Sequence, residues 1–270
     1  MLEFFDEDFD NIPLVEGALE LNKAINPETK VHWAKQELER LYKDAEATLV
    51  HETDEEQRFD AFLRLFFHEW GGFKGDEQEY FISDNSFIDK VLERRKGIPV
   101  SLGSILLYLG KKLGVPVEGS YFPYSVPVKV DWMHKKPDYI NPFNGEYVGE
   151  RILQAWLIGQ EGPLAQLKAE HFEEADNPTI IGRWLALIKS AMLREEHYTL
   201  ALRCTNLALT FVPDDPYEIR DRGFIFQQLE CPQVAVSDFQ YFIDQCPDDP
   251  ASELLKSQVN VMSETHVTLH

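Results

Sequence analysis

The 270-residue sequence has few cysteines, and they are confined to its last third. The three are Cys204, Cys231 and Cys246, an odd and sparse set in a chain that lacks an export signal. Such a set indicates reduced thiols and argues against a disulfide framework. Neither a Cys-x-x-Cys pair nor a His-Glu-x-x-His motif occurs, which argues against zinc. We therefore expect no metal and no cofactor.

Long apolar runs are also missing. No window approaches the roughly 18 uninterrupted apolar residues that a membrane helix needs. The start, Met1 to Asp8, is acidic and lacks the basic head of a signal peptide. We therefore expect a cytoplasmic protein that does not associate with membranes.

Positive charge is scarce, because 26 Lys and Arg face 47 Asp and Glu and leave a net charge of −21. Residues 1–85 carry a net charge of −14 and residues 151–270 carry −9, while residues 86–150 carry +2. A long acidic surface repels phosphate backbones and anionic lipid. Nucleic acid is therefore a poor candidate partner for the whole molecule and we expect none, and the simplest role of the acidic surface is solubility.

The apolar residues of the sequence predict helices in the first part of the chain. Apolar residues make up 44% of the chain and aromatic residues 12%, enough for a sizeable core. Amphipathic spacing predicts helices over 14–25, roughly 28–50 and 55–70. Asn85-Ser86 offers a cap for a helix that stops at Gly97, and Pro99 opens another through Lys112. Strand-like runs follow at 117–122, 126–132 and 139–140.

Helical patterns return after Gly149, and the last third contains a repeat. Pro213-Asp214-Asp215-Pro216 recurs as Pro247-Asp248-Asp249-Pro250, a shift of 34 residues. The same shift maps Ala201 onto Ala235. Thirty-four residues is the period of tetratricopeptide helix pairs. We therefore predict two repeats, at about 182–215 and 216–249.

A set of motifs in the middle of the chain resembles a known family. The motifs are Asn85-Ser86-Phe87, Leu92 to Leu102 (LERRKGIPVSL), Phe122-Pro123, Asn141-Pro142-Phe143-Asn144-Gly145 and Arg220-Asp221-Arg222-Gly223. Their order, followed by the repeat, resembles the SirB family of bacterial proteins. The resemblance implies an α+β fold, with a transglutaminase-like (papain-type) helical core and a small antiparallel sheet in residues 1–150. All-helical tetratricopeptide-like repeats would follow in residues 151–270. The family also implies a regulatory setting.

The resemblance further implies where catalytic residues would stand. In active domains of this kind a Cys begins the core helix, a His on the adjacent strand acts as base, and an Asp orients the His. The matching positions here hold Ser101, Ser125 and Asn141. Three replacements together favour lost chemistry, with Ser101 capping its helix. His134, in an expected exposed turn, is the nearest imidazole in sequence that could serve Ser101.

Basic residues supply the candidate binding sites. Arg94 and Arg95 could hold a carboxylate or phosphate, or could pair with the acidic N-terminal helices. Arg220 and Arg222 could hold a partner's acidic terminus or pair with nearby aspartates. With them, the candidate binding residues are Arg94, Arg95, Tyr124, Asn144, Arg220 and Arg222.

We therefore expect a non-catalytic protein that binds another protein or peptide in a regulatory role. Two alternatives remain open. One is a serine-dependent acyl hydrolase or amidase that uses Ser101 with His134. The other is small-ligand binding in a vestigial cleft beside Ser101, Ser125 and Asn141.

Overall fold

The computed structural model describes residues 12–120, 122, 127–174 and 176–267. Its contacts define one unit that ends at Trp184 and a second that begins at Leu185, so the division falls inside helix α8 (Asn177–Arg194). We expected the boundary near residue 150. The difference arises because residues 150–184 pack onto the first unit, where Trp184 donates from Nε1 to the buried carbonyl of Ser86 at 3.0 Å.

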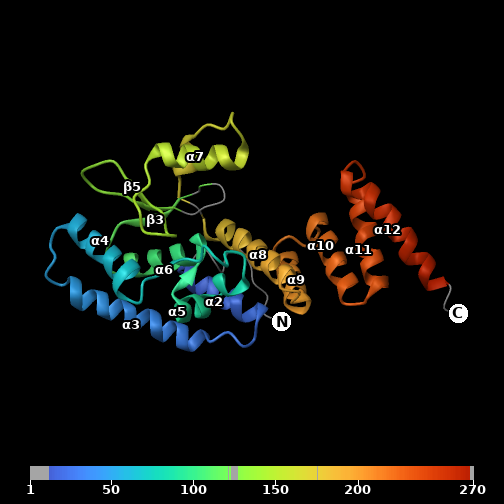
Figure 1. Cartoon of the computed structure of the whole chain (residues 1–270), viewed down its shortest axis with the longest axis horizontal. Helices are drawn as coiled ribbons and strands as arrows, with labels where there is room; N and C mark the ends of the chain where they lie inside the picture. The colour runs from blue at the N-terminus through green and yellow to red at the C-terminus, as the bar shows by residue number, and fades with distance from the viewer. Residues whose placement is uncertain (1–11, 121, 123–126, 175, 268–270) are drawn as a thin grey trace. The chain divides into compact units, whose positions relative to one another are not determined.

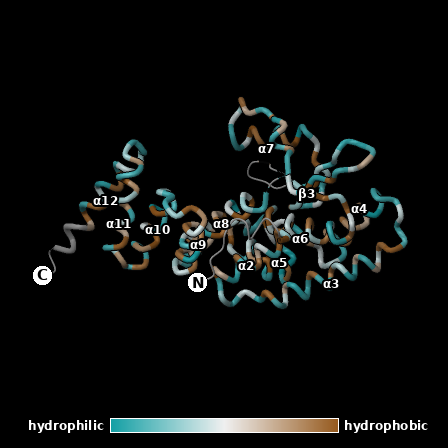
Figure 2. The backbone as a smooth tube through the Cα atoms, turned by 180° about the vertical axis from the view of Figure 1, so that it is seen from behind, coloured by the Kyte–Doolittle hydropathy of each residue, from teal (hydrophilic) through white to brown (hydrophobic). Residues whose placement is uncertain are grey.

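From residue 12, where the described part of the chain begins, the first unit starts with two helices, α2 (Leu14–Ile25) and α3 (Val31–Leu49). The second begins later than the predicted residue 28. The reason is a tight turn around Pro27, in which the Asn26 side chain accepts from the Glu28 amide at 3.0 Å and the Thr29 hydroxyl donates to the Asn26 carbonyl at 2.8 Å. Helix α3 buries one stripe of its surface, formed by Ala34, Leu38, Leu41, Ala45 and Leu49. Figure 2 shows the resulting alternation of hydrophilic and hydrophobic segments along α3.

The predicted helix over 55–70 is present in two parts, α4 (Glu55–Arg64) and a π-helical turn (Leu65–Glu69). The π turn rotates successive aromatic rings into the core. Phe66 is fully buried there, and its ring stacks on Phe73 with centroids 4.4 Å apart. The chain then reverses at Gly71 and Gly72, both in the left-handed region.

Three helices and a pair of strands form the centre of the first unit. They are η2 (Ser83–Asn85), α5 (Ile88–Arg94) and α6 (Pro99–Lys112), with β1 (Lys74–Gly75) pairing in parallel with β2 (Lys96–Gly97). The prediction for α6 is confirmed at both ends. The predicted Asn85-Ser86 cap of α5 is wrong, because α5 starts at Ile88. The side-chain amide of Asn85 instead donates to the carbonyls of Glu79 and Tyr80, which precede it in the chain.

The small antiparallel sheet has the order β3-β4-β5, with β3 (Val117–Gly119), β4 (Val128–Val130) and β5 (Asp138–Ile140). Val117 pairs with Val130, and Val128 pairs with Ile140. All four side chains are buried, as the two-residue period of a strand requires when one face meets a core. Figure 1 shows the sheet beside α7 (Glu150–Glu161), whose Leu153 and Leu157 pack with Phe122 and Val148. The short 3₁₀ turn η3 (Ala169–Phe172) adds Phe172 to this cluster.

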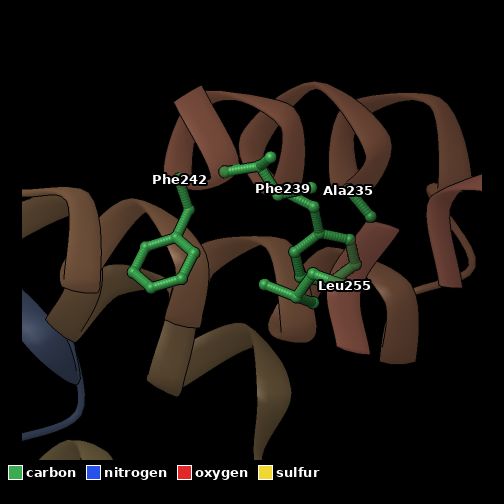
Figure 3. Close-up of a cluster of buried hydrophobic side chains, with 5 residues drawn as sticks. Ala235, Phe239, Phe242 and Leu255 are labelled. Atoms are coloured by element: carbon green, nitrogen blue, oxygen red, sulfur yellow. The ribbon is translucent and has the colours of Figure 1, made fainter. Parts of the chain in front are cut away.

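The second unit contains antiparallel helix pairs, as the 34-residue repeat predicts. Its complete helices are α9 (Tyr198–Phe211), α10 (Pro216–Gln228), α11 (Pro232–Gln245) and α12 (Pro250–Val267). Ala235, Phe239, Phe242 and Leu255 form a buried cluster that Figure 3 shows in close-up. Glycine is required at position 223, because a Cβ there would lie 2.7 Å from the Phe239 ring. Among the described residues, no helix has the length and apolarity to cross a membrane.

Candidate functional site

Ser101, the residue at the nucleophile position, lies at the start of α6. Pro99 opens the helix and Ser101 is its third residue. The Ser101 hydroxyl oxygen accepts a hydrogen bond from the Ile98 amide at 3.1 Å and donates its proton to the Asn85 carbonyl at 2.6 Å. The residue is 0% exposed. Its hydroxyl therefore satisfies one of the orphan amides at a helix N-terminus and ties the helix to the preceding loop.

The chain approaches this hydroxyl closely at position 97. A Cβ on Gly97 would lie 2.7 Å from the Ser101 oxygen and 3.1 Å from Val91. Only glycine therefore lets β2 run directly beside the start of α6 without displacing the hydroxyl.

Asn85 is the second buried polar residue of the site. Its side-chain oxygen accepts from Arg94 at 2.9 Å, and its amide donates to the Glu79 carbonyl at 2.7 Å. Its own carbonyl is the acceptor for Ser101. Asn85 therefore links the loop after β1, helix α5 and helix α6 in one hydrogen-bonded network.

Arg94 continues the network to a buried carboxylate. Its guanidinium meets Asp76 at 2.9 Å, and Lys96 reaches the other Asp76 oxygen at 3.5 Å. Burial alone would raise the pKa of Asp76, but the Glu79 amide and the charges of Lys96 and Arg94 together lower that pKa below its usual value. Asp76 is therefore ionised in the interior, and the two cations neutralise it.

The Arg95 side chain also makes its contacts within the first unit. It adopts the left-handed conformation with φ 57°, its guanidinium lies 4.6 Å from the centre of the Phe73 ring, and it pairs with Glu37 of α3. The hydrogen bond from Arg40 is the largest cause that lowers the pKa of Glu37, and Arg95 lowers it further. The basic cluster of the sequence therefore serves internal ion pairs, including the predicted pairing with an acidic N-terminal helix.

Asn141 and Asn144 shape a loop after β5. The Asn141 side chain accepts from the Phe143 amide at 3.0 Å, and its backbone amide donates to the Glu146 carbonyl at 2.9 Å. Asn144 is exposed, and its side chain donates to the Glu146 carboxylate at 2.7 Å. Gly145 has φ +78°, and a Cβ there would lie 2.5 Å from the Phe67 ring. The hydrogen bonds of Asn141 are thus made within its own turn.

Two predicted site residues, Ser125 and Tyr124, lie outside the described residues. His134 lies in an exposed turn between β4 and β5, as predicted. Within the described part of the chain, Ser101 makes its hydrogen bonds with backbone groups of Ile98 and Asn85, and none involves an imidazole. The structure therefore does not bring His134 to Ser101.

A pocket does lie along α6, but one turn further on than expected. Its volume is about 720 Å³, and Ser104, Leu107 and Tyr108 line it, whereas Ser101 and Asn141 do not. Sequence reasoning missed this site because it combines α6 with residues 12–14, Glu174 and residues 176–180, which are far away in the chain.

In the repeat unit, the two candidate arginines are engaged by aspartates. Arg222 forms a bidentate pair with the buried Asp238, at 2.8 and 2.7 Å, and this bond raises the pKa of Arg222. Arg220 bonds Asp221 at 2.8 Å, as one of the two hypotheses predicted. Its guanidinium also lies 5.3 Å from the centre of the Tyr217 ring.

Lys189 is a residue that sequence reasoning missed. Its ammonium is nearly buried and meets Glu218 at 2.6 Å and Asp221 at 2.7 Å. These bonds outweigh burial and raise the pKa of Lys189. The residue joins α8 to α10, and no local pattern in the sequence marks it.

Exposed apolar side chains follow two helices of the repeat unit. Tyr217 and Phe224 lie seven residues apart on α10, and Leu254 and Val261 lie seven apart on α12. Seven residues make two helical turns, so each pair shares one face. Gln258 of α12 donates to Gln227 of α10 at 2.7 Å. We call these four apolar residues the repeat face.

Comparison with known proteins agrees with this architecture. Residues 32–186 match a family model described as the transglutaminase-like superfamily, and residues 188–260 match a tetratricopeptide repeat model. The molecule is thus a transglutaminase-like protein that carries tetratricopeptide repeats, as its fold indicates. No solved structure matches the chain.

Full-length relatives identify the family more narrowly. The chain is 67% identical to a UPF0162 protein of Vibrio cholerae, 38% identical to Protein SirB1 of Salmonella typhimurium, and 37% identical to UPF0162 protein YchA of Escherichia coli K12. Each alignment covers 100% of both chains. The chain therefore belongs to the SirB family of the transglutaminase-like superfamily, which confirms the resemblance carried by its motifs.

Proposed function

We propose that this chain is a cytoplasmic, non-catalytic protein that binds a segment of another protein in a regulatory role. The observation that carries the proposal is the state of Ser101. Its hydroxyl is fully buried, accepts from one backbone group and donates to another. A nucleophile needs a base within hydrogen-bond reach and access to a substrate carbonyl. The described residues offer Ser101 neither, which favours a role other than acyl transfer.

The repeat face supports the binding half of the proposal. Leu254 is 74% exposed and Val261 is 64% exposed, so α12 presents two large aliphatic side chains to solvent. Burying such side chains against a partner yields about 1.5–3 kcal/mol each. Tetratricopeptide repeats generally bind other proteins, and the family name supports a regulatory setting.

The charges of the repeat unit indicate which kind of partner segment would bind there. Lys189, Arg220 and Arg222 are all paired with carboxylates of the unit. Residues 185–270 carry 6 Lys and Arg and 13 Asp and Glu, a net charge of −7. The expected occupant of the repeat face is therefore a segment that combines apolar side chains with Lys or Arg, because opposite charge speeds association and excludes acidic competitors.

A matched pair of variants tests the binding site. The double variant Leu254→Lys with Val261→Lys adds positive charge to the repeat face. Its control, Leu164→Lys with Val50→Lys, changes side chains that are 91% and 63% exposed in the first unit. In pull-downs with the full chain, a partner captured by the wild type and by the control should be lost with the repeat-face variant. Equal capture by all three proteins would contradict binding at this face.

A separate experiment tests the absence of catalysis. A fluorophosphonate probe should leave the wild type unlabelled. Labelling that disappears in Ser101→Ala and in His134→Ala would instead establish the serine hydrolase hypothesis. The two experiments are independent, because a catalytic Ser101 would not affect capture through the repeat face.

A further inference from the structure

The pocket along α6 belongs to the first unit alone. Its wall is formed by residues 12–14, one face of α6, the end of β3 at Gly119, and Glu174 with residues 176–180. Its volume of about 720 Å³ falls within the range of small-molecule sites, roughly 300–1,000 Å³. The pocket is therefore large enough for a metabolite, and it does not depend on Ser101.

The floor of the pocket is apolar. Leu14, Leu107 and Ile180 line it and are each buried in the fold. Leu107 and Tyr108 both come from α6 and both line the pocket. Such a surface favours the apolar part of a ligand, because its transfer out of water is favourable.

Two of the four charged side chains of the wall, Lys112 and Asp176, are engaged by groups of the fold. Lys112 bonds Glu39 at 2.6 Å, and its ammonium lies 4.4 Å from the centre of the Tyr42 ring. Asp176 accepts from the amide and the hydroxyl of Thr179, at 2.7 and 2.9 Å, at the start of α8. These groups are fixed by the fold and shape the pocket without being offered to a ligand.

Lys111 and Glu174 differ from the others. Their charged atoms are 3.9 Å apart, at the limit of an ion pair, and both side chains are 58% exposed. An exposed pair of this kind contributes little to stability, so separating it costs little. The pocket lining thus combines one exposed ammonium and one exposed carboxylate, Lys111 and Glu174, which we call the rim, with buried apolar side chains.

We propose that this pocket binds a small zwitterion with an apolar body, namely a free amino acid or a close derivative. Its carboxylate bonds Lys111, its ammonium bonds Glu174, and its side chain lies on Leu14, Leu107 and Ile180. The weak ion pair of the rim is replaced by two charge-assisted bonds. A ligand with only one charge leaves Lys111 or Glu174 without its partner, and this sets the specificity.

Calorimetric titration of the full chain with three probes tests the proposal. Phenylalanine carries both charges, N-acetylphenylalanine only the negative one, and phenylalaninamide only the positive one. Phenylalanine should bind about tenfold or more tightly than either single-charge probe, as expected when one charge-assisted bond is lost. Equal affinities for the three, or no saturable heat with phenylalanine, would overturn the proposal.

Rim variants locate the binding. Lys111→Glu and Glu174→Lys should each weaken phenylalanine binding by about tenfold, because each places a like charge against the ligand. Lys43→Glu is the control, since Lys43 is 70% exposed on α3 and does not line the pocket. Affinity unchanged in both rim variants would also overturn the proposal, and because the three probes are compared on the wild type, the test does not depend on the variants folding.

Discussion

Replacing Ser101 by alanine tests the central structural interpretation. The change removes the oxygen that accepts from the Ile98 amide and the proton donated to the Asn85 carbonyl. Both backbone groups would be left in a site that is 0% exposed. Loss of a helix cap costs about 0.5–2 kcal/mol, and a buried group without a partner costs about 1–3 kcal/mol. We therefore expect Ser101→Ala to lower the free energy of unfolding by about 2–4 kcal/mol.

Urea unfolding followed by tryptophan fluorescence measures this loss of stability in the first unit, to which Ser101 belongs. The five tryptophans are Trp33, Trp70, Trp132, Trp156 and Trp184, so all belong to the first unit. With a urea dependence of about 2 kcal/mol per molar, the midpoint should fall by about 1–2 M.

Ser104→Ala is the matched control. Ser104 lies on the same helix and is 1% exposed, but its hydroxyl donates to the Ser101 carbonyl, which also accepts within the helix. Its removal leaves no orphaned backbone group, so the cost should stay within about 1 kcal/mol. Equal midpoints for the two serine variants would refute the anchoring role of Ser101.

Three further predictions concern the loop after β5, the buried acid and the thiols. In urea unfolding, Gly145→Ala should destabilise the first unit by about 2–4 kcal/mol and its control Gly114→Ala by about 1 kcal/mol. Both glycines have positive φ, but only a Cβ at Gly145 would meet another residue, Phe67. Equal losses for the two variants would contradict this. The pKa of Asp76 is lower in the folded state, so its stabilising effect is complete above the unfolded-state pKa of about 3.9 and is lost as pH falls through the folded value. The difference in unfolding midpoint between Asp76→Asn and the wild type should therefore shrink on acidification, and a constant difference would argue against the ion pairs. Burial raises the pKa of Cys204 to about 12, so iodoacetamide near pH 8 should label the exposed Cys231 in the native protein and Cys204 only after unfolding, as mass spectrometry would show.

Sequence patterns predicted the elements whose signals are local. The aromatic stripe of residues 59–70 marks α4 and its π-helical continuation, and Pro99 marks the start of α6. The recurrence of Pro-Asp-Asp-Pro after 34 residues marks the helix pairs of the second unit, since solenoid units repeat their packing. The family resemblance also followed from local motifs.

Features that depend on distant partners could not be predicted. Pairing of the basic cluster with an acidic N-terminal helix was one hypothesis from the sequence, but no local spacing identifies Glu37, 58 residues away, as the partner of Arg95, or Asp76 as the partner of Arg94. The parallel pairing of β1 with β2 involves two residues in each strand, too few for a periodic signal. The pocket draws on residues 12 to 180 for the same reason. The sequence motifs contain Asn85, Arg94 and Ser101 of the network, but they predicted neither the hydrogen bonds among these residues nor the participation of Asp76.

The Ser101 oxygen has a consequence for any attempt to engineer activity into this scaffold. A thiol has a longer bond to carbon and donates only weakly, so a cysteine at position 101 would not reproduce the two backbone contacts. An attacking sulfur must also meet solvent and substrate, while the oxygen here is enclosed. Reactivity and structural anchoring therefore compete for a single atom, and a designer would first have to supply another brace between the Asn85 loop and α6.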